Sequence, residues 1–210
     1  SRTWGEWEKL IRTDPDAARA LEFTAAQLRD ARVSVEEADE EVMPDRVLAK
    51  AQADFVRWNL LEALEPGWSE VIQQMTRGPL GYGFSIHEEV MSQCAHRLLP
   101  GGTGYKLARL AERLPVTIEP NGWIEEGGEL KTIRQQGEKN GKWQSIDLPA
   151  SSVLLISWNR NGNNYLGFSA FRSVWYICKI REQLLKLAGI SLMREGAGIP
   201  IATMDKDVSL

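Results

Sequence analysis

The sequence predicts an α+β fold: an antiparallel sheet flanked by helices, with a long amphipathic helix near the C-terminus. Residues 45–64 carry apolar side chains at helical spacing. Residues 81–158 contain short alternating segments separated by links rich in Gly, Asn and Pro, which is typical of strands and turns. Residues 165–195 return to a helical spacing that is sustained for about 25 residues. Helices and strands therefore occupy separate stretches of the chain, as in α+β proteins.

The composition is ordinary for a globular protein. The 210 residues suffice for one large domain or two small ones, and a hydrophobic content of 43% is enough to bury a core. No window approaches the roughly 18 uncharged apolar residues of a membrane-spanning helix, so we expect no membrane association. The net charge of −4 argues against a protein that grips nucleic acid through a basic surface. It leaves open a protein that holds DNA loosely in a channel.

We expect the 210 residues to form one α+β domain that is part of a longer polypeptide. The chain begins with Ser1 rather than methionine, and its first residues lack the apolar core of a signal peptide. It ends at Leu210 without a capping signal or a polar tail. A processed N-terminus combined with a genuine C-terminus is the alternative.

The two cysteines, Cys94 and Cys178, could form one disulfide on number alone. Cys178 lies inside an apolar helical pattern, which favours a buried free thiol. We therefore interpret the cysteine usage as that of a reducing compartment.

The N-terminal part, residues 1–80, is predicted to be mainly helical. Asp14 and Pro15 suit the N-cap and first position of a helix that runs to Arg29. Residues 32–37 alternate and predict a short strand. The acidic run that follows is interpreted as a solvated loop and helix start. A metal site or a site for a basic partner is the alternative, although nothing fixes the carboxylates in one geometry.

Two further helices are expected before the strands begin. The first covers residues 45–64, with an apolar face made by Val47, Ala51, Phe55, Trp58, Leu61 and Leu64. Pro66-Gly67 ends it, and the second runs from Trp68 to about Thr76. Residues 78–83, Gly-Pro-Leu-Gly-Tyr-Gly, then predict a turn from helix to strand. They match neither the dinucleotide-binding fingerprint nor the phosphate-binding loop, so no cofactor is expected.

The middle part, residues 81–158, is predicted to be a small antiparallel sheet. Its expected strands are residues 84–90, 116–118, 130–134, 143–146 and 153–158. Asn140-Gly141 predicts a hairpin turn. Residues 105–113 fit either a strand or a helix, because their leucines have helical spacing.

The long helix, expected over residues 165–195, is predicted to be the element on which the others pack. Gly167 is placed at its start, and the Ser169 hydroxyl is expected to satisfy a backbone N–H in its first turn. From residue 160 to the end there are seven Lys or Arg residues and only four acidic ones. This mild positive bias suggests a solvated helix face or contact with phosphate.

No residue presents itself as catalytic, cofactor-binding or metal-ligating. His87 and His96 are the only histidines, and neither belongs to a metal or nucleophile motif. A monomeric hydrolase remains an alternative if either histidine meets Ser or Asp in a pocket. A protein-binding module is a second alternative, because eight tryptophans are an excess of the large rings that interfaces use.

Several segments, in a fixed order, resemble one known family. They are Asp14 to Arg32, Leu80-Gly-Tyr-Gly-Phe84, Glu88-Glu-Val90, Gly128-Glu-Leu130, Val153 to Trp158, Asn164-Tyr-Leu-Gly-Phe-Ser-Ala-Phe-Arg172 with Trp175 and Lys179, and Gly198-Ile-Pro200. Together they resemble the portal proteins of tailed bacteriophages, in the Mu-like branch. Each motif is only moderately specific, and their shared order carries the resemblance.

The resemblance implies a structural protein without catalytic residues. Portal subunits form a ring, typically a dodecamer, at one capsid vertex, where the ring contacts the major capsid protein. Double-stranded DNA passes through the ring during packaging and ejection. The ring docks the terminase and later the head–tail connector, so the implied location is the virion, after assembly in the host cytoplasm. This chain would cover mainly the wing region, and the loop nearest the DNA would lie beyond Leu210.

Within this resemblance, the charged side of the long helix becomes a candidate subunit interface. The residues concerned are Arg172, Lys179, Arg181 and Lys186. A ring subunit makes head-to-tail contacts that close on themselves, so its two contacting surfaces differ.

Overall fold

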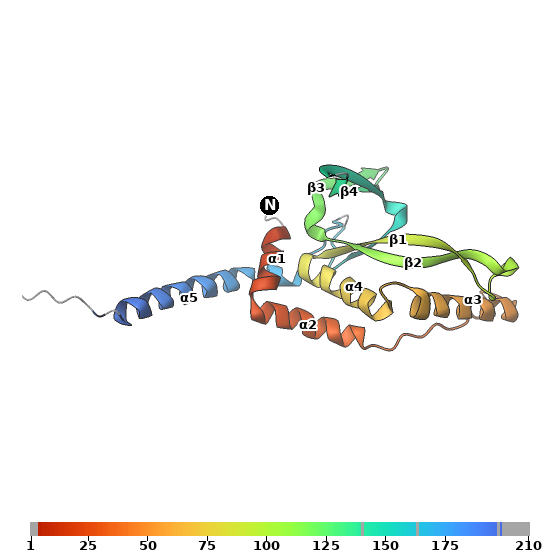
Figure 1. Ribbon diagram of the computed structural model, residues 1–210, viewed down its shortest axis with the longest axis horizontal. Coiled ribbons are helices and arrows are strands. Elements are labelled where there is room, and N and C mark those ends of the chain that lie inside the picture. The colour runs from red at the N-terminus through yellow and green to blue at the C-terminus, as the bar shows by residue number, and fades with distance from the viewer. Residues whose placement is uncertain (1–3, 140, 163, 197, 199–210) are drawn as a thin grey trace, which may run out of the picture. The chain divides into compact units, whose positions relative to one another are not determined.

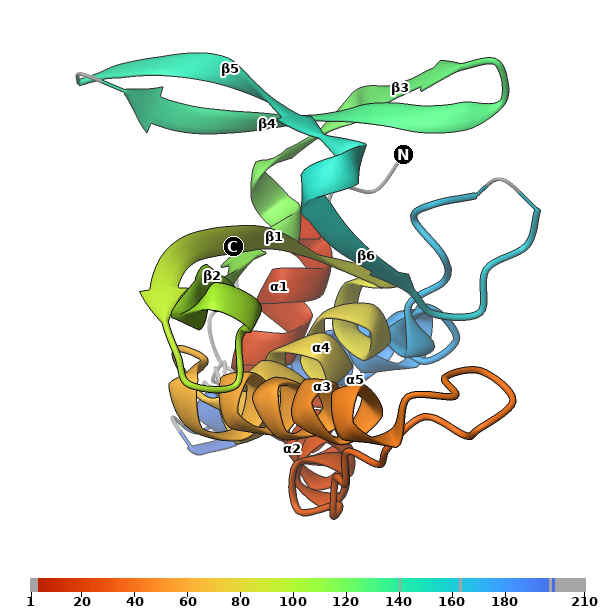
Figure 2. The same ribbon diagram turned by 90° about the vertical axis from the view of Figure 1, so that its right-hand side faces the viewer.

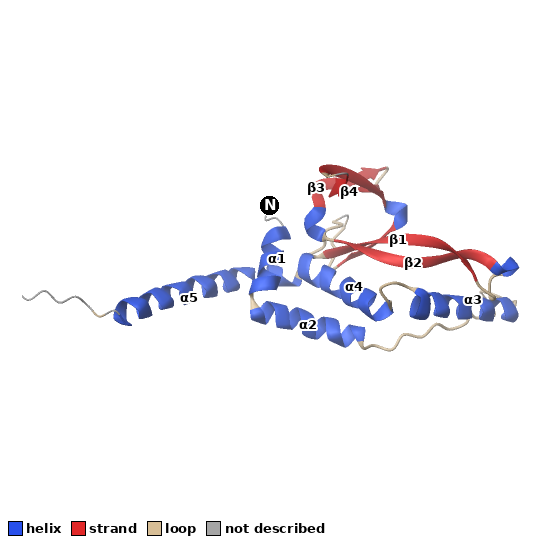
Figure 3. Ribbon diagram, viewed as in Figure 1, coloured by secondary structure: helices blue, strands red, loops and turns tan. Residues whose placement is uncertain are grey.

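The computed structural model describes residues 4–139, 141–162, 164–196 and 198. It confirms the α+β class, with helices before and after two groups of strands (Figure 3). The chain divides into two compact units, Ser1–Arg172 and Ser173–Leu210. We call the first unit the body.

Four helices open the body (Figure 1): α1 (Trp4–Thr13), α2 (Pro15–Arg29), α3 (Arg46–Trp58) and α4 (Trp68–Tyr82). The predicted start of α2 is confirmed, because the Asp14 carboxylate accepts hydrogen bonds from the backbone N–H groups of Asp16 and Ala17. The predicted strand over residues 32–37 is wrong. That segment has no regular secondary structure, and its side chains are mostly exposed, so alternation there reflects no buried face.

Helix α3 begins where the sequence predicts but buries a different face. Asp45 is its N-cap, with the carboxylate 3.1 Å from the N–H groups of Val47 and Leu48. The side chain of Val47 is nevertheless 82% exposed, whereas Ala49 and Ala53 are buried. The small side chains thus face the interior. The helix continues as a π-helical turn, Asn59–Ala63.

Helix α4 runs six residues beyond its predicted end, through the stretch expected to be a turn. Pro79 lies inside the helix, and Gly83 ends it with a left-handed conformation, φ +100°. The glycines serve close packing instead of a turn. A Cβ atom on Gly78 would lie 2.5 Å from the Cβ of Ser85, and one on Gly81 would lie 2.8 Å from Ile11 Cδ1.

Two three-stranded antiparallel sheets follow, where the sequence predicted one. The strands are β1 (Phe84–Ala95), β2 (Thr103–Arg113), β3 (Ile118–Glu126), β4 (Glu129–Lys139), β5 (Lys142–Pro149) and β6 (Val153–Ser157). Their orders are β2-β1-β6 and β3-β4-β5, and the second sheet lies above the first in Figure 2. The ambiguous residues 105–113 form a strand. The predicted hairpin is confirmed by the pairing of Lys139 with Lys142, although Asn140 itself lies outside the described residues.

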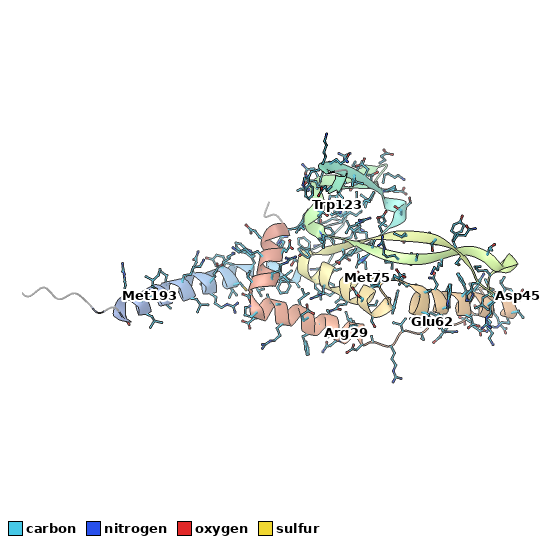
Figure 4. The ribbon with its side chains drawn as sticks, viewed as in Figure 1. Arg29, Asp45, Glu62, Met75, Trp123 and Met193 are labelled. Atoms are coloured by element: carbon cyan, nitrogen blue, oxygen red, sulfur yellow. The ribbon has the colours of Figure 1, made fainter. Side chains whose placement is uncertain are left out.

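The long β1–β2 hairpin is anchored to the helices at an irregularity in its register. Pairing shifts between Val90 and Met91, opposite Ala108 on β2. The buried Asn59 side chain donates to the Leu107 carbonyl at 2.8 Å and accepts from the Leu107 N–H at 2.9 Å. The Glu65 N–H donates to the Ala108 carbonyl at 3.0 Å. Met75 points from α4 toward this hairpin and packs beside Leu110 (Figure 4).

The main core joins the two sheets. Phe84 and Ile86 of β1 are fully buried and pack with Ile118, Ile133 and Leu148 of the second sheet. Because the strands of both sheets contribute to one cluster, the small sheet is held to the large one by apolar contact as well as by the chain.

The long helix α5 (Trp175–Gly196) differs from its prediction in two respects. It begins ten residues later than the predicted 165, and none of its residues is buried. The expectation that the other elements pack on it is therefore wrong. The shortening has a local cause: Gly167 has φ +55°, so the chain turns there and enters a 3₁₀ turn, Ala170–Arg172. No helix in the described residues combines the length and apolarity that crossing a bilayer requires.

Candidate functional site

Two segments that stand far apart in the sequence meet at one end of the body. They are the end of α4 with the start of β1, residues 80–84, and the turn formed by residues 165–172. The Trp158 N–H donates to the Gly83 carbonyl at 2.7 Å, and the Phe168 N–H donates to the Trp158 carbonyl at 2.9 Å. We call this region the glycine junction.

Two glycines make the junction possible. Gly83 and Gly167 both have positive φ, which an L side chain adopts only at a cost. A Cβ atom on Gly83 would lie 2.4 Å from the Leu166 carbonyl oxygen. One on Gly167 would lie 2.3 Å from the carbonyl oxygen of Trp158. Both contacts are with backbone, so a side chain could not rotate out of the way.

Ser169 closes the junction. Its hydroxyl is buried, donates to the Gly81 carbonyl at 2.7 Å and accepts from the Phe171 N–H at 3.1 Å. The predicted role of satisfying a backbone N–H is therefore confirmed, but in the 3₁₀ turn before α5. The same hydroxyl satisfies a carbonyl near the end of α4, where carbonyl groups lack helical partners. Ser169 thus connects two signature segments, a role that spacing along the chain could not indicate.

A hollow of about 450 Å³ lies beside the junction. Its walls come from α1, the end of α4 and the turn after β6, and its lining residues are Trp4, Trp7, Tyr82, Leu166, Gly167, Phe168, Ser169 and Arg172. The Arg172 guanidinium lies over the Phe168 ring, 5.0 Å from its centroid. Burial, reinforced by the negative charge of Glu8, raises the pKa of Tyr82 to about 12. The hollow therefore offers aromatic faces, one exposed cation and a phenol that stays protonated.

The four predicted interface residues are not brought together as one set. Arg172 belongs to the body, whereas Lys179, Arg181 and Lys186 belong to α5. Lys179 and Lys186 approach the Glu182 carboxylate at 3.3 and 2.9 Å, so these two share a side of the helix. Their hydrogen bonds, first that of Lys186, hold the pKa of Glu182 below its ordinary value. Arg181 follows Lys179 by two positions and so points to a different side.

The histidines do not form the pocket that a hydrolase would need. His87 is fully buried in β1, with Nε2 3.2 Å from the Ser85 hydroxyl, and Ser85 is fully buried too. A substrate cannot reach a pair that is sealed in this way. His96 stacks on Trp58 with ring centroids 4.1 Å apart. Among the residues that the structure describes, no group of three potential ligands could hold a metal ion.

The buried imidazole makes stability depend on pH. Desolvation lowers the pKa of His87 from 6.5 to about 4. Between these values the unfolded chain binds a proton that the folded chain does not. The stabilisation is complete above pH 6.5 and is lost as the pH falls through this window. As the pH falls through this window, protonation of His87 is expected to lower the free energy of unfolding by about 2 to 3 kcal/mol.

The measurement is denaturant unfolding at a series of pH values, comparing the wild type with His87→Gln. Glu112, opposite His87 on β2, has a pKa that is raised mainly by burial. Its protonation therefore favours the folded state as the pH falls, which opposes the effect of His87. Glu112 is present in both proteins, so the difference between the two profiles isolates His87. Parallel profiles would contradict the prediction.

The chain belongs to a family of phage portal proteins. The family model described as "Portal protein of Mu bacteriophage" matches residues 5–209, nearly the whole chain. The glycine junction, where both signature segments meet, lies within the match. Comparison with curated protein sequences yields no match.

Solved structures support the fold. One chain of "Virion of native gene transfer agent (GTA) particle" matches with a TM-score of 0.52 and 14% identity, covering 91% of this chain and 47% of that chain. One chain of "Neck of empty GTA particle computed with C6 symmetry" matches with a TM-score of 0.56 and 12% identity, covering 96% and 49%. The chain thus spans about half the length of the solved chains that it matches.

Proposed function

We propose that this chain is the wing region of a portal subunit whose copies form a ring, a dodecamer, at one vertex of a phage capsid. The ring conducts double-stranded DNA during packaging and ejection. It contacts the major capsid protein and docks the terminase and the head–tail connector, and it is part of the virion after assembly in the host cytoplasm. The observation that carries this proposal is the family match over residues 5–209.

The surface of α5 supports self-association. Of nine exposed large apolar side chains on the described part of α5, six fall on one side of the helix at about 100° per residue, each between 40% and 66% exposed: Tyr176, Ile177, Ile180, Leu184, Leu187 and Ile190. Leu185, Leu192 and Met193 lie on other sides of the helix. We call the set of six the α5 apolar face. Removing such a face from water is favourable, and in a ring a second copy of the chain can cover it.

The charged side of α5 is the second candidate contact. Lys179 and Lys186 flank one edge of the apolar face, and Arg181 flanks the other edge. We assign Lys179, Arg181, Lys186 and the body residue Arg172 to the subunit interface. The net charge of −4 fits a ring that lets DNA slide instead of gripping it.

The test is the mass of the full-length protein in solution, together with negative-stain images of its assemblies. We expect a ring for the wild type. Leu184→Asp should weaken assembly by at least about 30-fold, because it places an unpaired charge in a buried contact. Lys179→Glu and Arg181→Glu should weaken it less, since charges at an interface rim contribute less.

The matched control is Val47→Asp, which changes another exposed apolar residue on α3. It should leave assembly unchanged. A full-length protein that stays monomeric at high concentration would overturn the proposed function. If the ring forms normally with Lys179→Glu and Arg181→Glu, the charged side of α5 is exposed to solvent and takes no part in the subunit interface.

A further inference from the structure

Trp143 stands on the wrong side of its sheet for a core residue. It is 75% exposed near the start of β5. Side chains of directly opposed residues lie on the same face of a sheet. Trp143 is opposed by Glu138, and two positions along Ser145 is opposed by Gln136, so these four side chains share one face. The other face carries Ile133 and Leu148, which are buried in the core. The indole therefore projects into solvent from the polar face of the second sheet.

The carboxylate of Glu138 lies beside the exposed Trp143 indole. It is exposed and lies directly across from Trp143 on β4, so a carboxylate and an indole stand side by side next to the hairpin turn. Burying an indole contributes more to an interface than burying most other side chains. We call Trp143 and Glu138 the hairpin knob.

The hollow beside the glycine junction has the complementary chemistry. Its volume of about 450 Å³ lies in the range of sites that hold small aromatic groups. Trp4, Trp7 and Phe168 supply aromatic faces, and Arg172 supplies an exposed cation. An indole can stack on these rings, and a guanidinium can pair with a carboxylate that accompanies it.

The knob and the hollow cannot meet within one molecule. In Figure 2 the strand ends where β4 and β5 pair last, and the chain that follows β6, lie on opposite sides of the body; the chain after β6 leads into the wall of the hollow. A knob on one side and a matching hollow on the other are the two halves of a head-to-tail contact, the kind that generates a ring when the rotation closes.

We propose that the hairpin knob of one copy inserts into the hollow of the next copy. The Trp143 indole occupies the space among Trp4, Trp7 and Phe168, and the Glu138 carboxylate pairs with the Arg172 guanidinium. The occupant of the hollow is thus a second copy of this chain. This contact deepens the proposed function, on which it rests, and is separate from the contact through the α5 apolar face.

The first experiment is a crosslinking map of the assembled full-length protein. A photoreactive phenylalanine analogue replaces Trp143 in copies that carry heavy nitrogen, and these are mixed with unlabelled wild-type copies. After illumination, mass spectrometry identifies the linked peptides, and the isotope pattern distinguishes links between copies from links within one. The control places the same analogue at Tyr105, which is 67% exposed on β2.

We expect links from position 143 to peptides of a second copy that contain Trp4 and Trp7 or residues 166–172, and none of these from position 105. A ring whose links from position 143 go elsewhere would overturn the proposed contact while leaving the proposed function intact. A protein that forms no assembly would overturn both.

The second experiment reverses the charges across the contact. Glu138→Arg and Arg172→Glu should each weaken self-association by about tenfold, and the double variant should recover most of this loss. Trp143→Ala should weaken self-association by about 30-fold. Recovery requires that the two charges face each other, so a double variant as weak as the sum of the single ones would contradict the pairing.

Discussion

Replacing Gly167 by alanine is expected to lower the free energy of unfolding by about 3 kcal/mol or more. The added Cβ would stand 2.3 and 2.4 Å from the carbonyl oxygens of Trp158 and Gly83. The hydrogen bond that ties Trp158 to Gly83, at 2.7 Å, would have to lengthen or break to make room. To this is added the cost of holding an alanine at φ +55°.

Gly162→Ala separates these two costs. Gly162 also has a positive φ, +58°, but a Cβ added there would have no atom within 4 Å. It should lose only about 1 kcal/mol, the conformational cost alone. Denaturant unfolding followed by circular dichroism gives both values. Equal losses for Gly162→Ala and Gly167→Ala would mean that the junction relaxes around a side chain and is not tightly packed.

The glycine junction also shows what sequence reasoning can and cannot supply. Local chemistry was predictable: Asp14 caps α2 as expected, because a cap depends only on the next few residues. The two signature segments were recognised as motifs, but their mutual contact was not. Residues 80–84 and 165–172 are joined by backbone hydrogen bonds across more than 70 residues of intervening chain, and no local pattern records such a pairing.

The errors have a common physical source. Gly78-Pro-Leu-Gly-Tyr-Gly83 looked like a turn because glycine and proline usually interrupt helices, yet its glycines are buried where α4 meets β1 and α1. The helical spacing of apolar residues in α5 was recognised, but spacing cannot say what covers a face. The spacing predicted a core inside this chain, and the helix instead presents apolar side chains of the predicted stripe, such as Leu185 and Leu192, to solvent. Local sequence patterns do not contain the tertiary contacts that decide such cases.

Replacing Phe84 by alanine is expected to lower the free energy of unfolding by about 3 to 5 kcal/mol. Phe84 is fully buried at the start of β1. Its ring meets Trp4 of α1 and Trp123 of β3 edge to face, with centroids 5.3 and 5.4 Å apart. Removing the ring would leave a cavity and separate three elements, because α1 and both sheets contact one another through this side chain.

Phe23→Ala is the matched control, since it makes the same chemical change on α2 at a side chain that is 64% exposed. It should change the free energy of unfolding by no more than about 0.5 kcal/mol. Hydrogen exchange adds a local measurement. Because Phe84 joins the small sheet to the large one, its loss should speed exchange at the β3 amides more than at those of α3, which lies outside this core cluster. A uniform increase across the body would instead mean that the two sheets open together, with Phe84 contributing to a single cooperative unit.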